Sequence, residues 1–234
     1  MDFAKYVDML STNSLYFSRF NKLEDPYEGK LTEFDREMEE KGMEYLKSKW
    51  GEKWSEISGD ATPERREFLE KLRIDSVVNC WHMNEYESAM MWKLYSDGNF
   101  GIVIKSTIGR LGDSFKTNYY VPVYCVRYLD YTKDAIGKEW VNNEQLFTKR
   151  MSFKHEQEVR AIIGSNYCSP DGKPYLNLNP DEKGKRIPVD LNSLIEEVYT
   201  NPLSEDWFVE LVKSMTKNYL PDKKVERSHI YSLK

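Results

Sequence analysis

Two glutamates one residue apart, Glu156 and Glu158, are the residues of this chain best suited to chemistry. They lie in the segment KRMSFKHEQEVRAII, which runs from Lys149 to Ile163 and becomes apolar at its end. In an extended chain the side chains alternate between two faces, so both glutamates would share one face with Arg160. Two carboxylates about 7 Å apart along a strand are costly unless they meet water, a cation or a substrate.

A helix that starts in this segment is the alternative interpretation. Glu156 and Arg160 would then form an ion pair on the helix surface, worth about 0.2–0.5 kcal/mol. From Glu158 onward the pattern favours a strand, because Val159 and Ala161 alternate with the two charged residues. We therefore expect an extended segment at least from Glu158.

Other acids and histidines suggest a different chemistry. Carboxylates and imidazoles could assemble a metal site that activates water to cut phosphodiesters, although their spacing matches no standard metal motif. The candidates are Asp25, Glu28, His82, Glu87, His155 and Glu158. Each also has a structural interpretation, such as a turn begun by Asp25 or a hydrogen-bonded His82 at a helix start. Lys149 and Arg150 either bind phosphates or neutralise the neighbouring acids.

Helix and strand patterns along the sequence show which elements must position these residues. They predict an α+β fold in a single domain, residues 1–234, with a mixed or antiparallel sheet and flanking helices. Helices are predicted over DFAKYVDML, NEYESAMMWKLYS, EWVNNEQLFTKR and SEDWFVELVKSMTKNYL. The last is predicted to be capped by Ser204 and to turn inward the residues Phe208, Leu211, Val212, Met215 and Tyr219. Strands are predicted over SLYFSRF, DSVVNCW, GIVIKST, VYCVRYLDY, EVRAIIG, RIPVDL and IEEVYTNP. Residues 34–73, rich in Glu, Lys and Arg, predict a helical pair that breaks near Gly59 to Pro63 and forms a charged helical insertion.

The helix predicted over NEYESAMMWKLYS carries a capping box, with Asn84 as the cap and Glu87 three residues later. Its inward stripe is predicted to consist of Ser88, Met91, Trp92 and Tyr95. Trp92 and Tyr95 then belong either to the core or to a platform that stacks on a base or a nicotinamide ring.

Composition narrows the class of protein. Of the 234 residues 40% are apolar and 14% aromatic, which is enough for a packed core. The net charge of −5 does not indicate a nucleic-acid partner, although a local basic patch is compatible with one. Cys80, Cys125 and Cys168 lack metal spacing and fit reduced thiols. With no apolar run near ~18 residues and no apolar leader, we expect a cytoplasmic protein without a membrane span.

Three stretches together resemble the bacterial and phage family catalogued as domain of unknown function 2971. They are LYFSRFNKLEDPYEG, NCWHMNEYESAMMWKLYS with GIVIKST, and KRMSFKHEQEVRAI. The resemblance spans nearly the whole chain, and the block from NCWH to MW is its most specific part. It implies a shared fold and one more short strand ahead of the MDFAKY helix, and it assigns no activity.

The spacing of Glu156 and Glu158 also resembles the Glu-x-Glu signature of the ADP-ribosyltransferase superfamily. This resemblance implies that Glu158 binds the nicotinamide-ribose hydroxyl and stabilises an oxocarbenium-like transition state, while Glu156 positions the acceptor. It also implies a basic residue on an early strand and a Ser-Thr pair on a later one. Arg19 and the pair Ser106 and Thr107 follow that order, and NAD is the cofactor that the order implies.

These candidates predict one polar cleft. The charged run, which includes Lys149, Arg150, His155 and Arg160, would form one wall. The EDPYEG turn and the corner from His82 to Glu87 would form the others. The Trp92 helix would form the floor and residues 34–73 a lid.

Three functions stay open at this point. They are glycosyl transfer from NAD or another nucleotide, metal-dependent cleavage of phosphoesters or nucleic acid, and non-catalytic binding of a ligand or partner in bacteria–phage conflict. The acidic net charge and the aromatic content favour a pocket for a small nucleotide. The sequence leaves the oligomeric state open.

Overall fold

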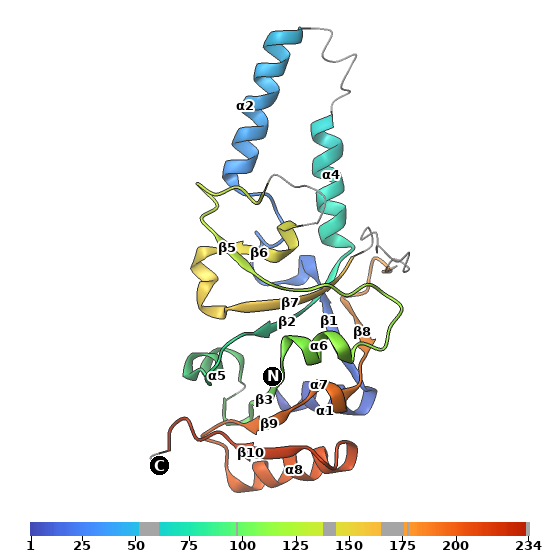
Figure 1. Cartoon of the computed structure of the whole chain (residues 1–234), viewed down its shortest axis with the longest axis vertical. Coiled ribbons are helices and arrows are strands. Elements are labelled where there is room, and N and C mark those ends of the chain that lie inside the picture. Colours follow the sequence, from blue (N-terminus) through green and yellow to red (C-terminus); the bar gives the residue numbers. More distant parts are fainter. Residues whose placement is uncertain (52–60, 97, 138–143, 165–175, 177, 233–234) are drawn as a thin grey trace. The chain divides into compact units, whose positions relative to one another are not determined.

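The computed structural model of the chain describes residues 1–51, 61–96, 98–137, 144–164, 176 and 178–232, and it has the α+β architecture expected from the sequence (Figure 1). The chain divides into two compact units, each assembled from separate stretches. Unit 1 comprises Met1–Phe17, Met83–Val123 and Lys185–Lys234, and unit 2 comprises Ser18–His82 and Tyr124–Gly184. No single point of the sequence separates the units, and the expectation of one domain over residues 1–234 stays a prediction.

Unit 1 is built on a three-stranded sheet of order β10-β9-β3, with β3 antiparallel and β10 parallel to β9. The strands are β3 (Ile102–Lys105), β9 (Glu197–Thr200) and β10 (Lys224–Arg227). The helices are α1 (Phe3–Thr12), α5 (Ala89–Tyr95), α6 (Ile108–Ser114), α7 (Leu191–Leu194) and α8 (Asp206–Tyr219), and η2 (Gly98–Phe100) is a 3-10 turn. The sequence predicts neither β10 nor the short helices α6 and α7.

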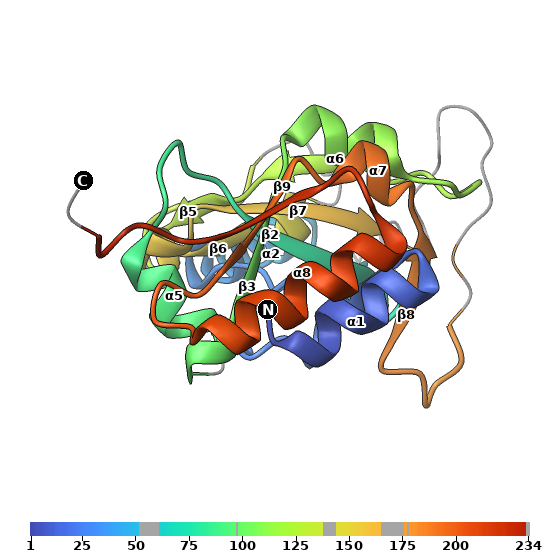
Figure 2. The same cartoon turned by 90° about the horizontal axis from the view of Figure 1, so that it is seen from below.

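Helices α1 and α8 lie alongside each other in unit 1 (Figure 2). The hydroxyls of Tyr6 and Thr216 share a buried hydrogen bond of 2.7 Å. The rings of Phe3 and Phe208 meet edge to face, with centroids 5.6 Å apart. Two amphipathic helices distant in the sequence thus bury their apolar faces together.

Unit 2 is organised around the antiparallel pair β2 and β7, which is part of a five-stranded sheet of order β4-β7-β2-β1-β8. The strands of this sheet are β1 (Ser14–Arg19), β2 (Val77–His82), β4 (Val123–Cys125), β7 (Glu158–Ile163) and β8 (Gly184–Pro188), of which only β2 and β7 consist entirely of unit 2 residues. The prediction that the chain is extended from Glu158 is confirmed. Every residue of β7 is buried, and Ile162 joins the core with Val78, Phe20, Leu72 and Leu146.

The remaining elements of unit 2 are short, apart from two helices described below. They are the parallel strands β5 (Arg127–Leu129) and β6 (Thr148–Arg150), and the 3-10 helices η1 (Phe20–Lys22), η3 (Glu144–Phe147) and η4 (Met151–Glu156). Of the helix predicted over EWVNNEQLFTKR, Glu144–Phe147 form the 3-10 helix η3, whereas Thr148–Arg150 are the strand β6, so the prediction is wrong from Thr148 onward; residues 138–143 lie outside the described part. The strand predicted over VYCVRYLDY is broken at Val126, whose amide donates to the carbonyl of Glu158 at 2.8 Å.

The charged insertion is a pair of helices, α2 (Glu33–Trp50) and α4 (Ala61–Ile74), as predicted. Thr32 caps α2, because its hydroxyl accepts a hydrogen bond from the amide of Asp35 at 3.0 Å. Pro63 lies in the first turn of α4, where a proline needs no backbone donor, and the expected break at Gly59 falls among residues outside the described part. Asp35 is the only buried residue of α2.

Two predicted helix starts are wrong. Helix α5 begins at Ala89 with Ser88 as its cap, whereas Asn84 accepts from the amide of Tyr86 in the preceding turn. Helix α8 begins at Asp206, and the Ser204 hydroxyl donates instead to the carbonyl of Asn99 at 2.6 Å. In both cases the predicted cap makes a hydrogen bond outside the helix.

The inward faces of these two helices also differ from the prediction. Trp92 is buried on α5, but Tyr95 is 51% exposed. On α8 the buried residues are Phe208, Val209, Val212 and Thr216, whereas the predicted Leu211 and Tyr219 are 39% and 42% exposed. Among the described residues, no helix is long and apolar enough to cross a membrane.

Gln157 joins η4 to β7 in a left-handed backbone conformation, with φ 42°. This conformation places Cβ close to the following carbonyl oxygen, so it is unfavourable for residues other than glycine and asparagine. Glu156 therefore belongs to a 3-10 turn, and the alternation along the strand starts one residue after Gln157. The predicted strand face that combines Glu156 with Glu158 is wrong for this reason.

We predict that Gln157→Gly raises the free energy of unfolding by about 0.5–1 kcal/mol, because it removes the left-handed strain at some cost in unfolded-state entropy. Asn13→Gly is the matched control, since Asn13 has φ 46° and asparagine tolerates this region. Chemical denaturation of both variants measures the difference. An equal gain at the two positions would contradict the strain at Gln157.

Candidate functional site

The register of β2 and β7 places four polar side chains on one face of unit 2. Cys80 pairs with Arg160 and His82 pairs with Glu158, so these residues stand next to one another across the two strands. The opposite face carries Trp81 and Val159. The candidate site therefore starts at the end of β2 where His82 meets the beginning of β7.

Arg160 is fully buried, and its guanidinium is held by three partners. Its Nε donates to Oε1 of Glu158 at 2.9 Å and its Nη2 to Oε2 at 3.0 Å, which is a bidentate ion pair. Nη2 also donates to Glu28 at 2.7 Å, and Nη1 donates to the carbonyl of Leu146 at 2.8 Å. The ring of Phe20 lies 5.2 Å from the guanidinium carbon.

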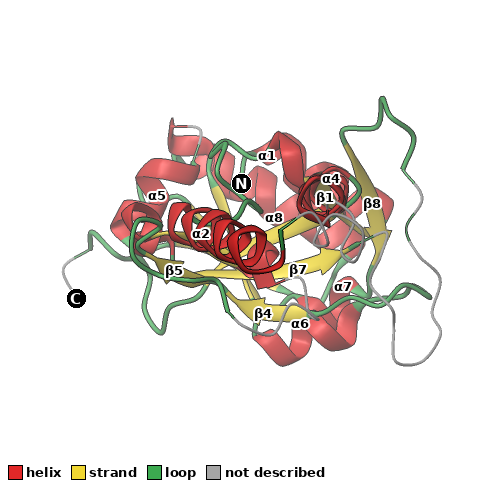
Figure 3. Ribbon diagram, turned by 90° about the horizontal axis from the view of Figure 1, so that it is seen from above, coloured by secondary structure: helices red, strands yellow, loops and turns green. Residues whose placement is uncertain are grey.

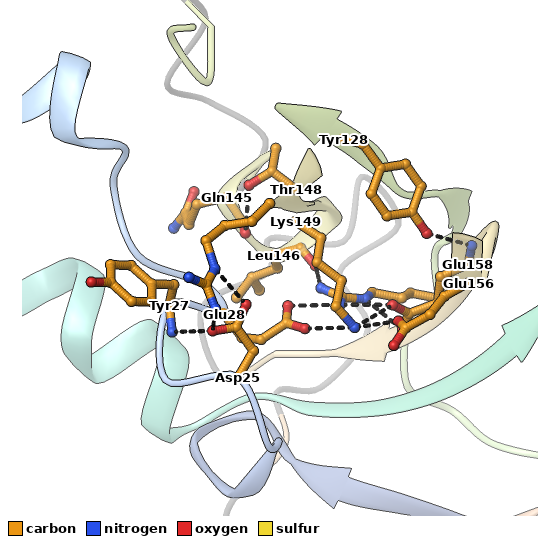
Figure 4. Close-up of polar contacts among 12 residues, drawn as sticks. Asp25, Tyr27, Glu28, Tyr128, Gln145, Leu146, Thr148, Lys149, Glu156 and Glu158 are labelled. Atoms are coloured by element: carbon orange, nitrogen blue, oxygen red, sulfur yellow. Dashed lines mark hydrogen bonds and ion pairs between the residues drawn. The ribbon is translucent and has the colours of Figure 1, made fainter. Parts of the chain in front are cut away.

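Lys149 extends this network toward the surface (Figure 4). Its Nζ lies 3.1 Å from Oε1 of Glu28 and 3.3 Å from Oε2 of Glu158, and it also binds Oε2 of Glu156. The side chains of Lys149 and Glu156 are 10% and 13% exposed, against 0% for Arg160. Both glutamates of the Glu-x-Glu pattern thus meet at one lysine, even though only Glu158 lies in the strand.

A second ion pair joins the EDPYEG turn to β6. Arg150 donates from Nε and Nη2 to the two carboxylate oxygens of Asp25, at 3.0 Å and 2.8 Å. The carboxylate of Asp25 also accepts from the amide of Tyr27 at 3.0 Å, as expected for a turn begun by aspartate. The Arg150 guanidinium stacks on the Tyr27 ring at 4.4 Å, and its side chain is 35% exposed.

The charges of this network do not cancel. Four carboxylates face three cations, which leaves one negative charge in excess among the residues Asp25, Glu28, Glu156, Glu158, Lys149, Arg150 and Arg160. A buried excess charge is costly unless a proton or a cation compensates it. The site therefore favours a positively charged species.

The pKa values of the two inner glutamates are shifted in opposite directions. Burial raises the pKa of Glu28 above its ordinary value, because Arg160 and Lys149 only partly offset the loss of water. Burial acts in the same way on Glu158, but its bidentate partner Arg160, together with Lys149, outweighs it and lowers the pKa. Glu158 is thus a fixed negative charge, and Glu28 is the group that takes up a proton first.

His82 has one ring nitrogen fixed and one without a partner. Its Nδ1 lies 2.6 Å from the carbonyl oxygen of Glu156, and since a carbonyl can only accept, Nδ1 carries the proton. Its Nε2 is buried and has no hydrogen-bond partner among the described residues. In the neutral ring Nε2 holds a lone pair, which suits a proton acceptor.

Cys80 shares the face of His82 and is exposed. Although the residue as a whole is exposed, burial of its thiol group, followed by the negative charge of Glu158, raises the pKa of Cys80 well above its ordinary value. The thiol is therefore protonated at neutral pH and is a poor nucleophile. Cys125 is also a free cysteine, whereas Cys168 lies outside the described residues.

Two further site residues predicted from the sequence, Arg19 and His155, also belong to unit 2. Arg19 is buried, and it donates to the backbone carbonyls of Pro180 and Asn179 at 2.8 Å and 3.1 Å. These bonds tie β1 to the segment before β8, so a structural role accounts for Arg19. His155 lies in η4 with its side chain exposed.

The other candidates belong to unit 1 and have local roles there. The Ser106 hydroxyl donates to the carbonyl of Leu194 at 2.6 Å, and Thr107 caps α6. Glu87 is exposed and accepts from the hydroxyl of Ser228 at 2.6 Å. Trp92 is buried in the core, which agrees with the structural interpretation of that residue.

The metal site expected as an alternative finds no support in the described residues, which contain no group of three or more histidines, cysteines and acids that could hold an ion. The reason is visible in the ion pairs. Glu28 and Glu158 point at Arg160 and Lys149, so cationic side chains already occupy the positions where a metal would bind.

Sequence reasoning missed two contributors to the site. The phenol oxygen of Tyr128 accepts the amide hydrogen of Glu158 at 2.7 Å and so fixes the start of β7. Cys80 was assigned only a redox state. The spacing of Cys80 and His82 within one strand could have identified Cys80, because residues two apart share a face. Tyr128 lies in a segment distant in sequence from Glu158, and no local sequence pattern predicts their contact.

The chain was compared with family models, curated proteins and solved structures, and none of them matches it.

We predict that Glu158→Gln lowers the free energy of unfolding by about 3–5 kcal/mol, because the buried Arg160 loses its bidentate carboxylate partner and keeps only one charge-assisted hydrogen bond, to Glu28. Glu156→Gln should cost at least about 2 kcal/mol less, since it removes the excess negative charge and Lys149 keeps Glu28 and Glu158. Urea denaturation of the two variants measures this difference. Equal costs would show that the network is not organised around Arg160.

We also predict a distinct pH dependence for Glu28. Its pKa is raised in the folded state, so between 4.5 and the folded pKa the folded chain binds more protons than the unfolded chain. Stability should rise through this window as the pH falls, and the rise should be absent in Glu28→Gln. For Glu158 the sign is opposite: its stabilisation is present above 4.5 and is lost below it.

Thermal melts of wild type and Glu28→Gln between neutral pH and 4.5 test this expectation. Glu70→Gln is the control, because Arg73 lowers the pKa of Glu70, so its contribution changes only below 4.5. A constant stability difference between wild type and Glu28→Gln across the window would refute the assignment of the excess proton to Glu28.

Proposed function

We propose that this chain is an enzyme that transfers a glycosyl group from NAD or a related nucleotide, and that Glu158 is its electrostatic centre. The observation that carries the proposal is the buried network with one negative charge in excess, in which Glu158 is held ionised. A transition state with oxocarbenium character is a transient cation, and a fixed negative charge in a site of low polarity stabilises it.

The residues around Glu158 supply the other parts of such a reaction. When the bond between ribose and nicotinamide breaks, its electrons leave with the nicotinamide, which becomes neutral, and the positive charge moves to the sugar. The lone pair on Nε2 of His82 is suited to accept the proton that an attacking hydroxyl loses. Glu156, between His82 and Lys149, is placed to orient that acceptor.

The outer residues of the site suit a negatively charged ligand. Arg150 keeps 35% of its side chain exposed while it binds Asp25, and Lys154 and His155 are exposed on the neighbouring η4. The cationic side chains of Arg150 and Lys154 near the surface favour binding of a diphosphate, and the buried acids favour the charge that develops on the sugar. This change from positive charge near the surface to negative charge in the interior supports a nucleotide substrate more than a neutral sugar.

The alternatives have less support. Cleavage of phosphoesters by a bound metal lacks a ligand cluster in the described residues. A binding module without catalysis has no need of a buried imidazole nitrogen that lacks a partner in the described part of the chain and lies beside an ionised glutamate. Membership in the family called domain of unknown function 2971 is part of the proposal and by itself assigns no reaction.

The test is release of nicotinamide from NAD by the purified chain, with and without candidate acceptors. We expect Glu158→Gln to lower turnover by about 10²–10³, because the carboxamide keeps the shape and loses the charge. His82→Gln should lower turnover by about 10²–10⁴ while leaving the ion pairs in place, which separates catalysis from folding.

Glu210→Gln is the control, because it removes a carboxylate from an exposed ion pair with Lys213 in α8 and should change neither turnover nor the melt. A thermal-shift assay with NAD reports binding separately from turnover. Wild-type protein that neither binds NAD or other nucleotides nor releases nicotinamide would rule the proposal out.

A further inference from the structure

Helix α2 presents an exposed apolar stripe that no residue described in this chain buries. Of its eighteen residues only Asp35 is buried, and Met38 and Tyr45 are 52% and 63% exposed. Met38, Gly42 and Tyr45 follow one another at intervals of four and three residues, so they share a face. In both views α2 stands apart from α4 (Figures 1 and 3).

A helix of this kind needs a partner. Helices in proteins gain most of their stability from packing of an amphipathic face rather than from intrinsic helix propensity. The first turn of α2 is anchored, since the Asp35 carboxylate accepts from Thr32 and from the amide of Ile136. The turns that follow carry the exposed stripe and bury no residue.

Gly42 is the second indication that another helix packs against α2. A glycine inside a helix costs about 1 kcal/mol relative to alanine. A Cβ built on Gly42 would meet nothing within 4 Å among the described residues, so none of their contacts requires glycine at this position. A residue without a side chain, between Met38 and Tyr45, allows a second helix backbone to approach closely.

The distribution of charge along α2 indicates which helix would pack against it. The first half, Glu33 to Glu40, contains five acids and one arginine, whereas the second half, Lys41 to Trp50, contains three lysines and one acid. Two copies of α2 in antiparallel orientation would place each acidic half against a basic half. The same arrangement, centred next to Gly42, would bring Met38 of each copy to Tyr45 of the other, a favourable sulfur–aromatic contact.

We propose that α2 is an interface between two copies of this chain, packed antiparallel about a two-fold axis beside Gly42. Such an interface is isologous, because each patch is complementary to itself. The proposal is independent of the proposed reaction, since it uses residues of α2 alone.

The first test is the oligomeric state in solution, measured by sedimentation equilibrium from micromolar to millimolar protein. Wild type should dimerise, and Gly42→Leu should weaken the dimer about tenfold or more by blocking the close approach. The same change should leave the monomer as stable as before or more stable, because leucine favours helix more than glycine does. Gly112→Leu in α6, where a Cβ also meets open space, is the matched control and should not affect dimerisation.

The second test distinguishes a copy of this chain from any other occupant. Glu37→Lys and Lys49→Glu should each weaken self-association, since like charges then face each other across the two-fold axis. A mixture of the two variants should form a heterodimer, because every exchanged charge regains an opposite partner. Glu210→Lys, a charge reversal on α8 where Glu210 also pairs with a lysine, should leave the dimer unchanged.

Circular dichroism of Glu37→Lys should show unchanged helix content, which would confirm that α2 survives loss of its exposed pair with Lys41. A wild-type chain that stays monomeric at millimolar concentration overturns the proposal. So does a dimer that Gly42→Leu leaves intact, or a mixture of the charge variants that does not associate.

Discussion

The buried guanidinium of Arg160 constrains the rest of unit 2. An arginine side chain stays charged at every accessible pH, so it cannot enter the interior without acceptors placed around it. Three separate segments supply them: the EDPYEG turn through Glu28, η3 through the Leu146 carbonyl, and β7 through Glu158. Segments far apart in the sequence are thereby held in one arrangement, and any shift of one would leave a buried charge unpaired.

Such a network is weak evidence for stability, because removal of two charges from water offsets much of their attraction. It is stronger evidence for a fixed electrostatic environment. The excess negative charge is divided unequally, since the pKa of Glu28 is raised and that of Glu158 is lowered. The bidentate contact with Arg160 explains the difference: Glu158 has two charge-assisted hydrogen bonds from that group, and Glu28 has one.

The sequence predicted the parts of this site that depend on local patterns. Alternation of apolar and charged residues predicted β7, and the Glu- and Lys-rich composition predicted the helices α2 and α4. The left-handed Gln157 was not predictable, because glutamine has no preference for that conformation, and it separates Glu156 from the strand. The capping box of Asn84 and Glu87 failed for another reason: Glu87 bonds to Ser228, which is remote in sequence. The meeting of Glu28, Lys149 and Arg160 depends on tertiary structure in the same way.

The network residues differ in their exposure. The buried ones determine the electrostatic potential of the site, and the more exposed ones can contact a ligand. Arg160, Glu28 and Glu158 are almost completely buried and fully bonded, so they can act on a substrate only through their charge. Their rigidity is useful for that purpose, since a preorganised charge needs no reorganisation when a cation forms. Contact with a ligand must come from side chains nearer the surface, such as Glu156 and Arg150. His82 belongs to both groups, because a backbone carbonyl fixes its orientation while its second nitrogen has no described partner. A proton transfer at this site would therefore use His82, and the ion pairs behind it would remain unchanged.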